Sequence, residues 1–241
     1  MLWNGQLKHN LANNQALARS ILFSTLKKHR NDDVKLGKMN ENILEHEEAE
    51  IIERVTNLDP FLAKNPTASF LGHMPVFRLS KETTKCRIVF LSNVCEKDTA
   101  TVPKINHNMA MFSEPCINHK LAILLMILRF DPKLLCFDLR KAFCLIELPD
   151  DDRNKLMFLW FRNVKNNDFT VQAFRNLRLS FGLRCSPTIL KVGLYIIHIR
   201  DTQNDSEKLK DLKERIYGFT YMDNCAITGE SVEYLQGPST N

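Results

Sequence analysis

Two apolar runs, far apart in the chain, each end in an aspartate, and this arrangement constrains the fold more than any other feature. The first run, residues 135–143, has the pattern of a buried strand that ends at Asp138, with Phe143 five residues later. The second run, residues 216–224, has a strand pattern that delivers Asp223 at a tight turn. A fold that brings both strand ends together creates a pair of carboxylates. Such a pair suits two Mg²⁺ ions about 3.5–4 Å apart, which can activate a hydroxyl and stabilise a departing phosphate.

A strand-end aspartate also has an ordinary structural explanation. Asp is common in turns, because its side chain makes local hydrogen bonds there. Taken alone, Asp138 and Asp223 are each better explained by a turn than by a metal site. Their surroundings in the sequence favour the metal role.

Length and composition allow a substantial core and exclude few partners. The 241 residues are 44% hydrophobic, which predicts one or two domains. The net charge of +5, from 33 basic and 28 acidic residues, permits a nucleic-acid partner without requiring one. The seven cysteines are odd in number and contain no CxxC pair, and several lie in apolar patterns where a thiol behaves as a small hydrophobe. We therefore expect a reduced, intracellular protein.

Neither a secretory signal nor a membrane span is expected. Residues 2–5 lack a long apolar core after a basic region. The longest apolar run, residues 121–128, is well short of the roughly 18 residues that a membrane span needs, and it predicts a buried helix. We expect a soluble chain without a membrane partner.

The residue patterns predict a helical start followed by strands mixed with helices. Helical patterns cover about residues 10–55, including a helix over 44–55 whose acidic face is expected to be solvated rather than to bind a metal. Strand patterns at 76–79 and 86–90 flank a polar turn and predict a hairpin with a basic tip. The later predictions are a helix at 117–130, strands at 156–161 and 169–174, helices at 186–200 and on through 214, and a hairpin at 217–228. Such a mixture indicates an α+β fold with a largely antiparallel sheet.

Three segments in this order resemble motifs A, B and C of a reverse transcriptase. They are Asp-x-x-x-Ala-Phe from Asp138, Phe-Gly-Leu-Arg-Cys-Ser-Pro at 181–187, and Tyr-Met-Asp-Asn at 221–224. Each motif alone is weakly specific. Their order along one chain is specific.

Further segments are similar to the polymerase of BEL/Pao-type LTR retrotransposons. They lie at residues 75–78, 83–90 and 158–162. The resemblance runs from about residue 36 to residue 229 and is strong from Phe70 onward.

The resemblance implies a right-hand polymerase, in which an antiparallel sheet backed by helices forms the palm and a fingers subdomain precedes it. The expected segments are a helical N-terminal segment at 1–60, fingers with the start of the palm at 61–135, and the palm with motifs A, B and C at 136–229. The family's thumb should follow the last hairpin. Because only the tail 230–241 remains, we expect the thumb to be absent and the chain to be truncated or a fragment of a polyprotein with other modules.

The resemblance also assigns roles at the predicted metal site. Asp138 and Asp223 would hold two Mg²⁺ ions, for which Mn²⁺ could substitute, and the backbone carbonyl of Leu139 would complete the shell. Asn224 stands where the family usually has a second Asp, so the site loses a negative charge but keeps a neutral oxygen. Phe143 would collide with a 2′-hydroxyl and so select dNTPs, and the alternative is that it is a core aromatic.

A second group of residues is implied to bind the incoming nucleotide. Arg87, with Lys81 and Lys85 on the same hairpin, would contact the triphosphate, because arginine binds phosphate oxygens bidentately. The alternative is an exposed basic hairpin without a fixed partner. Phe181 and Gly182 would pack against the templating base and the nucleotide, since a glycine lets the backbone approach a flat ligand closely.

Other chemistry is weakly indicated or not at all. The sequence has no zinc spacing, P-loop or nucleophile elbow. His107 and His119 lie near Cys116, but their irregular spacing favours satisfied or exposed histidines over a metal site. Trp160 is predicted to lie in the core, although an aromatic strand near a template groove could stack on bases.

These interpretations together predict an RNA-directed DNA polymerase domain that comprises fingers and palm. A primer 3′-hydroxyl would attack the α-phosphate of a dNTP on an RNA or DNA template, and pyrophosphate would leave. The protein would act in the cytoplasm, in a virus-like particle, or in the nucleus. A second hypothesis, favoured by Asn224 and the missing thumb, is a catalytically decayed or domesticated nucleic-acid-binding remnant. A third is an α+β protein whose motifs arise by chance.

Overall fold

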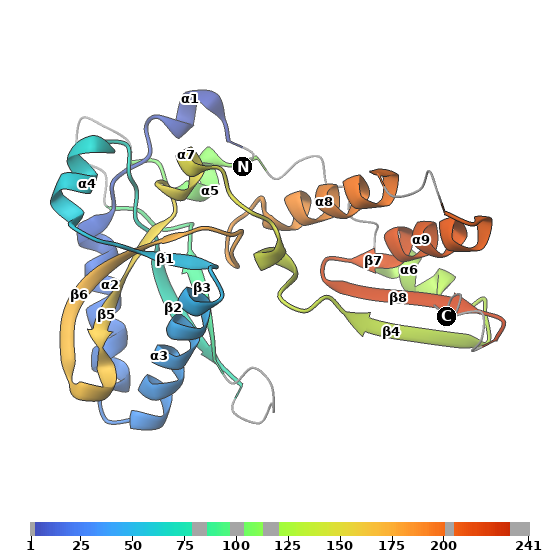
Figure 1. Cartoon of the computed structure of the whole chain (residues 1–241), viewed down its shortest axis with the longest axis horizontal. Coiled ribbons are helices and arrows are strands. Elements are labelled where there is room, and N and C mark those ends of the chain that lie inside the picture. Colours follow the sequence, from blue (N-terminus) through green and yellow to red (C-terminus); the bar gives the residue numbers. More distant parts are fainter. Residues whose placement is uncertain (1–2, 79–85, 97–103, 113–120, 201–204, 232–241) are drawn as a thin grey trace. The chain divides into compact units, whose positions relative to one another are not determined.

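The computed structural model forms two compact units (Figure 1). Unit 1 comprises residues 1–112 and 143–186, and unit 2 comprises residues 113–142 and 187–241. The predicted palm, 136–229, therefore contributes to both units, and the predicted segment boundaries stay a prediction. The residues that the structure describes are 3–78, 86–96, 104–112, 121–200 and 205–231.

Unit 1 contains a three-stranded antiparallel sheet and a two-stranded antiparallel hairpin (Figure 1). In sheet order, the first consists of β1 (Ile52–Val55), β6 (Asp168–Asn176) and β5 (Met157–Asn163), and the second of β2 (Gly72–Phe77) and β3 (Cys86–Leu91). The predicted strands and the predicted hairpin of this region are confirmed. The tip of the hairpin, residues 79–85, lies outside the described residues.

Two long helices of unit 1 pack on these strands. α2 (Gln15–His29) contacts β2 and β5, and α3 (Asp33–Glu48) contacts β1 and β3. The remaining helical segments are short: α1 (Gly5–Lys8), α4 (Leu58–Lys64), α5 (His107–Ala110), α7 (Asp150–Arg153), and the 3₁₀ turns η1 (Ala142–Leu145, which spans the unit boundary) and η2 (Val164–Asn166).

The helix predicted over 44–55 is wrong in its second half. α3 ends at Glu48, and Glu50 takes a left-handed conformation with φ 51° that ends the helical path. The chain then enters β1, where Ile52 pairs with Asn176 of β6. β-branched residues favour strands, and pairing with β6 outweighs the helical pattern of the acidic residues.

Aromatic residues on β5 and β6 form the core of unit 1. The rings of Phe158 and Phe174 stack at a centroid distance of 5.4 Å, and both side chains are almost fully buried. Trp160 is buried as predicted, and its Nε1 donates to Asn40 Oδ1 at 3.2 Å. Burial of each such ring stabilises the fold by roughly 2–3 kcal/mol, so these strands form the most strongly held part of the unit.

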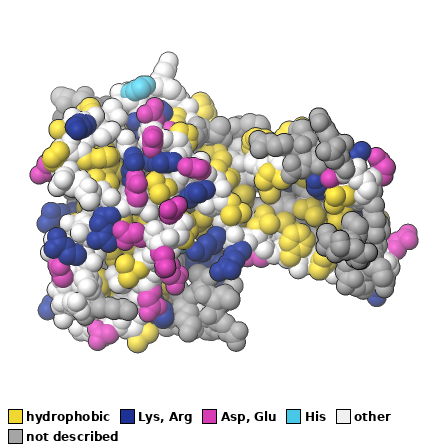
Figure 2. Space-filling view, in the orientation of Figure 1, with side chains coloured by type: hydrophobic (Ala, Val, Ile, Leu, Met, Phe, Trp, Pro, Cys, Tyr) yellow, Lys and Arg dark blue, Asp and Glu magenta, His cyan; other side chains and the backbone are white. Residues whose placement is uncertain are grey.

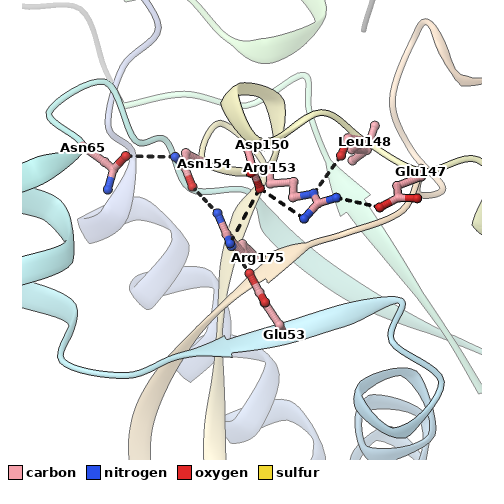
Figure 3. A network of polar contacts seen from close by, with 8 residues as sticks. All are labelled: Glu53, Asn65, Glu147, Leu148, Asp150, Arg153, Asn154 and Arg175. Atoms are coloured by element: carbon pink, nitrogen blue, oxygen red, sulfur yellow. Dashed lines mark hydrogen bonds and ion pairs between the residues drawn. The ribbon is translucent and has the colours of Figure 1, made fainter.

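A polar network joins β1, β6 and the segment around α7 (Figure 3). Arg175 of β6 donates to Glu53 of β1, and its Nη1 donates to Asn154 Oδ1 at 2.9 Å. Asn154 in turn donates to Asn65 Oδ1 at 2.9 Å, and Asp150 lies 3.9 Å from Arg175 Nη2. Glu53 belongs to the acidic run that was expected to be a solvated face, and here it has a defined ion-pair partner.

The described residues of unit 2 form a three-stranded antiparallel sheet and three helices (Figure 1). Its strands, in sheet order, are β4 (Lys133–Asp138), β8 (Asn224–Gly229) and β7 (Thr220–Tyr221), and its helices are α6 (Leu121–Ile127), α8 (Ser186–Arg200) and α9 (Glu207–Phe219). The helix at 186–200 is confirmed. α9 continues to Phe219, so residues 217–219 are helical and not part of the predicted hairpin. Within the described ranges, no helix is both long and apolar enough to cross a membrane.

The strand that leads to Asp138 is exposed, contrary to the prediction of a buried strand. All six residues of β4 are exposed, and Leu134 retains 54% of its accessible surface. In α6, which was predicted to be a buried helix, Leu124 is the one buried residue. Hydrophobic side chains accordingly appear on the surface of this unit (Figure 2). Apolar strands and helices are usually buried beneath another layer of the protein. Among the described residues, no further layer covers β4 and α6.

Helices and antiparallel strands are mixed in both units. The α+β fold class is therefore confirmed at this level.

Candidate functional site

The register of the unit 2 sheet brings the two predicted carboxylate residues together. Asp138, the last residue of β4, lies opposite Asn224, the first residue of β8. The backbone N–H of Leu139 donates to the backbone carbonyl of Asp223 at 3.0 Å. Asp138 and Asp223 are therefore neighbours at the same end of the sheet, although 84 residues lie between them in the sequence.

A tight turn presents Asp223. Tyr221 pairs with Asn224, so Met222 and Asp223 form a two-residue connection between β7 and β8. Met222 has φ 57°, in the left-handed region that non-glycine residues rarely occupy. Lys141, three residues after Asp138, has φ 53°. Residues of this kind cost about 1–3 kcal/mol each. Met222 directly precedes Asp223, and Lys141 follows Asp138 by three residues.

Both carboxylates act on the same buried thiol. Burial raises the pKa of Cys225, and the negative charges of Asp138 and Asp223 raise it further. The hydrogen bond with Thr220 and the charge of Lys191 act in the opposite direction and lower that pKa. Asp138 and Asp223 therefore lie within electrostatic range of one sulfur atom beneath the turn.

The donor set fits a hard cation such as Mg²⁺. Asp138 is exposed and Asp223 is half-buried, so both carboxylates can be reached from solvent. The Leu139 carbonyl accepts the N–H of Ala142 at 3.2 Å and has a second lone pair for a metal. Within the described residues, no group of three or more His, Cys, Asp and Glu side chains could hold a metal ion. A metal at this pair would therefore need carbonyl, water or substrate oxygens as further ligands, which is usual for Mg²⁺.

Asn224 contacts its neighbour directly. Its Nδ2 donates to Asp223 Oδ1 at 3.1 Å, and its side chain is exposed. A carboxylate at this position would repel Asp223, whereas the amide donates a hydrogen bond to it. Compared with a carboxylate at this position, Asn224 carries one negative charge fewer and adds a contact that can orient the Asp223 side chain.

The loop that carries Gly182 is docked on β3 in unit 1. Phe90 N–H donates to the Phe181 carbonyl at 3.2 Å, and the Ser92 hydroxyl donates to the Gly182 carbonyl. Gly182 has φ 97°, and a Cβ added to it would lie 2.1 Å from the Phe90 carbonyl oxygen. The structural reason for this glycine is therefore close approach to another strand of the protein, whereas its approach to a nucleotide stays a prediction.

Two other predicted nucleotide-binding residues surround Phe181. The Phe143 ring meets the Phe181 ring edge to face at 4.9 Å, and Phe143 is 7% exposed. The Arg87 guanidinium lies 5.7 Å from the centroid of Phe181, and Arg87 is exposed. The burial of Phe143 agrees with the core-aromatic alternative, and its role as a gate stays a prediction. Arg87 is held over a ring while its side chain remains open to solvent.

The predicted site residues thus form two groups, one in each unit. Unit 2 holds Asp138, Leu139, Asp223 and Asn224, and unit 1 holds Arg87, Phe143, Phe181 and Gly182. Lys81 and Lys85 lie outside the described residues.

One residue near the carboxylates was missed by sequence reasoning. Lys191 of α8 is 1% exposed, and its charge lowers the pKa of Cys225, the thiol on which both aspartates also act. A signal was available, because Lys191 is a single charge inside the apolar stretch from Ile189 to Ile197. A buried charge within such a helix requires partners, and these identify its position.

Comparisons with known proteins give matches to solved structures but none to a family model or a curated protein. Among solved structures, the chain is similar to a foamy viral protease–reverse transcriptase in complex with double-stranded DNA, with a TM-score of 0.49 and 15% sequence identity. The alignment covers 82% of this chain and 26% of that chain, so this chain spans about a quarter of that protein's length.

Proposed function

We propose that this chain is the fingers and palm part of an RNA-directed DNA polymerase from a BEL/Pao-like retroelement. The observation that carries the proposal is the β4–β8 register, which makes Asp138 and Asp223 neighbours at one end of a sheet. The order of the three polymerase-like motifs along the sequence supports it independently.

The unit 2 residues would form the catalytic centre. Asp138 and Asp223 would hold two Mg²⁺ ions together with the Leu139 carbonyl. When bound, such ions activate the attacking hydroxyl and stabilise the departing oxygen of an in-line displacement. The hydrogen bond from Asn224 would keep Asp223 oriented toward Asp138. The reaction would join a primer 3′-hydroxyl to the α-phosphate of a dNTP, with pyrophosphate as the leaving group.

The unit 1 residues would bind the nucleotide. Arg87 would neutralise phosphate charge, and the ring of Phe181 beneath its guanidinium would limit the orientations it can take. Phe143, packed against Phe181, would present a rigid ring to the sugar and exclude a 2′-hydroxyl. Template and primer would bind mainly through their phosphates, so their affinity should fall steeply with salt.

Primer extension tests the proposal. With an RNA template, a DNA primer, dNTPs and Mg²⁺, the unmodified protein should extend the primer and the Asp138→Ala variant should not. Asp211→Ala is the matched control, because it removes a half-exposed carboxylate from α9 in the same unit. Equal extension by the unmodified protein and the Asp138→Ala variant would contradict catalysis at this site.

Asn224 favours a second candidate function, a decayed or domesticated remnant that binds nucleic acid without copying it. This candidate predicts salt-sensitive binding to a primer–template and no extension, even in the Asn224→Asp variant. If Asn224→Asp instead starts synthesis in an otherwise inactive protein, the chain is a decayed enzyme whose scaffold is intact.

A further inference from the structure

A buried lysine lies behind the turn that carries Asp223. Nζ of Lys191 donates to the Tyr217 carbonyl at 2.5 Å and to the Thr220 carbonyl at 3.4 Å. It also lies 4.0 Å from the centroid of the Tyr217 ring. An ammonium removed from water is strongly unfavourable unless such acceptors replace its hydration. The position of the charge is therefore tied to these two carbonyl groups.

These carbonyls are located at the C-terminal end of α9. The last carbonyls of a helix lack intrahelical donors and carry partial negative charge, so a cation there is stabilising. α9 ends at Phe219 and has no basic residue in its own last turn. Lys191, from α8, supplies the cation that α9 itself lacks.

The same end of α9 leads directly into the turn. Thr220 is the first residue of β7 and pairs with Cys225 of β8, and its hydroxyl donates to the Ile216 carbonyl at 2.5 Å. Only two residues, Tyr221 and Met222, separate Thr220 from Asp223. A contact that fixes the Thr220 carbonyl therefore fixes the start of the segment that presents Asp223.

We propose that Lys191 is a positioning residue, which anchors the end of α9 and the start of β7 and thereby holds Asp223 beside Asp138. The consequence for metal binding rests on the proposed function. The anchoring itself rests only on the contacts of Lys191 and can be tested separately.

The chain offers a matched control in unit 1. Lys155 is also buried, at 5% exposed, and its Nζ donates to Thr67 Oγ1 at 3.1 Å. Lys155→Met and Lys191→Met remove the same charge and replace it with the same side chain. An effect that follows from removing any buried lysine would appear in both variants, whereas loss of positioning at the turn would appear in Lys191→Met alone.

The first measurement is hydrogen exchange at the Leu139 amide, which donates to the Asp223 carbonyl. In Lys191→Met this amide should exchange about tenfold faster than in the unmodified protein, because local opening governs exchange. In Lys155→Met it should exchange at the unmodified rate. This result is independent of any metal or activity.

The second measurement is Mn²⁺ binding, followed by electron paramagnetic resonance with Mn²⁺ alone. Loss of a residue that orients a metal ligand typically weakens affinity about ten- to a hundredfold, and this is the change expected for Lys191→Met. Lys155→Met should bind Mn²⁺ as the unmodified protein does. Asp138→Ala should abolish binding if the proposed metal site is correct.

The outcomes separate the two proposals. If Lys191→Met leaves both Leu139 exchange and Mn²⁺ affinity unchanged, or if Lys155→Met changes them equally, the positioning role is wrong. If Asp138→Ala binds Mn²⁺ like the unmodified protein, the metal site is wrong, and the exchange rates still decide the role of Lys191. If Lys191→Met does not fold, Lys191→Gln, which keeps an N–H donor without the charge, is measured in the same way. An unchanged Gln variant would also overturn the proposal.

Discussion

At the scale of single residues, the buried imidazole of His107 makes the stability of the protein depend on pH. His107 is fully buried, and its Nε2 lies 2.8 Å from the Lys155 carbonyl oxygen. Its Nδ1 is buried and has no hydrogen-bond partner among the residues that the structure describes. Burial lowers the pKa of His107 from 6.5 to about 4, although the hydrogen bond to Lys155 opposes the shift. The folded protein therefore holds this side chain in its neutral form.

We predict that the protein loses stability as the pH falls from 6.5 toward 4. In this pH range the unfolded chain binds a proton at His107, whereas the folded chain does not. The contribution is complete above pH 6.5, and its loss reaches roughly 3 kcal/mol near pH 4. Urea unfolding at pH 7 and pH 4.5 measures the difference.

Two variants control this measurement. His107→Gln should show a smaller loss between the two pH values, because Gln does not titrate. His9→Gln, which changes an exposed histidine, should lose stability as the unmodified protein does. If His107→Gln and the unmodified protein lose equal amounts, His107 does not cause the effect.

At the scale of elements, Gly182 and Gly37 differ in whether their position in the backbone requires a glycine. Gly182 lies in the loop before α8 with φ 97°, and an added Cβ would meet the Phe90 carbonyl oxygen. Gly37 lies inside α3, and an added Cβ there would meet nothing within 4 Å. The loop therefore requires a glycine and the helix does not.

We predict opposite effects for the two alanine variants. Gly182→Ala should destabilise unit 1 by at least about 2 kcal/mol, because the left-handed conformation and the clash with β3 both oppose it. Gly37→Ala should stabilise the protein by about 0.5–1 kcal/mol, since alanine is the better helix former. Urea unfolding followed by tryptophan fluorescence, to which Trp3 and Trp160 both contribute, measures both. A Gly182→Ala variant as stable as the unmodified protein would show that the loop does not depend on its docking to β3.

Elements with a strong local pattern could be predicted from the sequence. α2, α8 and the β2–β3 hairpin follow from periodicity and from polar turns, which act over a few residues. β1 could not be predicted, because its strand conformation depends on pairing with β6, more than a hundred residues away. The exposure of β4 could not be predicted either, since sequence patterns do not reveal whether another layer covers an apolar strand.

The candidate site, too, could be predicted only where it depends on local sequence motifs. The order of the motifs led to Asp138 and Asp223, and the register of unit 2 makes them neighbours. The docking of Gly182 on Phe90 and the capping of α9 by Lys191 are contacts between distant elements. No local pattern encodes such contacts, and only the folded arrangement shows them.

At the scale of the whole molecule, the two units differ in how much apolar surface they bury. Most of the buried hydrophobic residues belong to unit 1, including all the buried Phe and Trp side chains. Within the described part of unit 2, the buried hydrophobic residues are Leu124, Ala142, Leu190, Cys225 and Ile227. Because burial of apolar surface dominates folding stability, unit 1 should be the more stable unit.

We predict that the two units unfold in separate transitions. Both tryptophans, Trp3 and Trp160, lie in unit 1, so fluorescence reports on that unit while far-ultraviolet ellipticity reports on both. In a urea titration, ellipticity should begin to fall at a lower concentration than fluorescence changes. Trp3→Phe, which leaves the buried Trp160 as the sole reporter, should keep this order. Coincident curves would indicate one cooperative unit.

The exposure of β4 has a practical consequence for the protein at high concentration. An edge strand presents unpaired N–H and C=O groups, and natural proteins usually protect such edges with charges or bulges. Between Lys133 and Asp138, β4 has only Leu, Leu, Cys and Phe. Each molecule therefore carries an exposed apolar edge strand that can pair with the same strand of another molecule. Concentrated solutions should gel or form fibrils that start from unit 2.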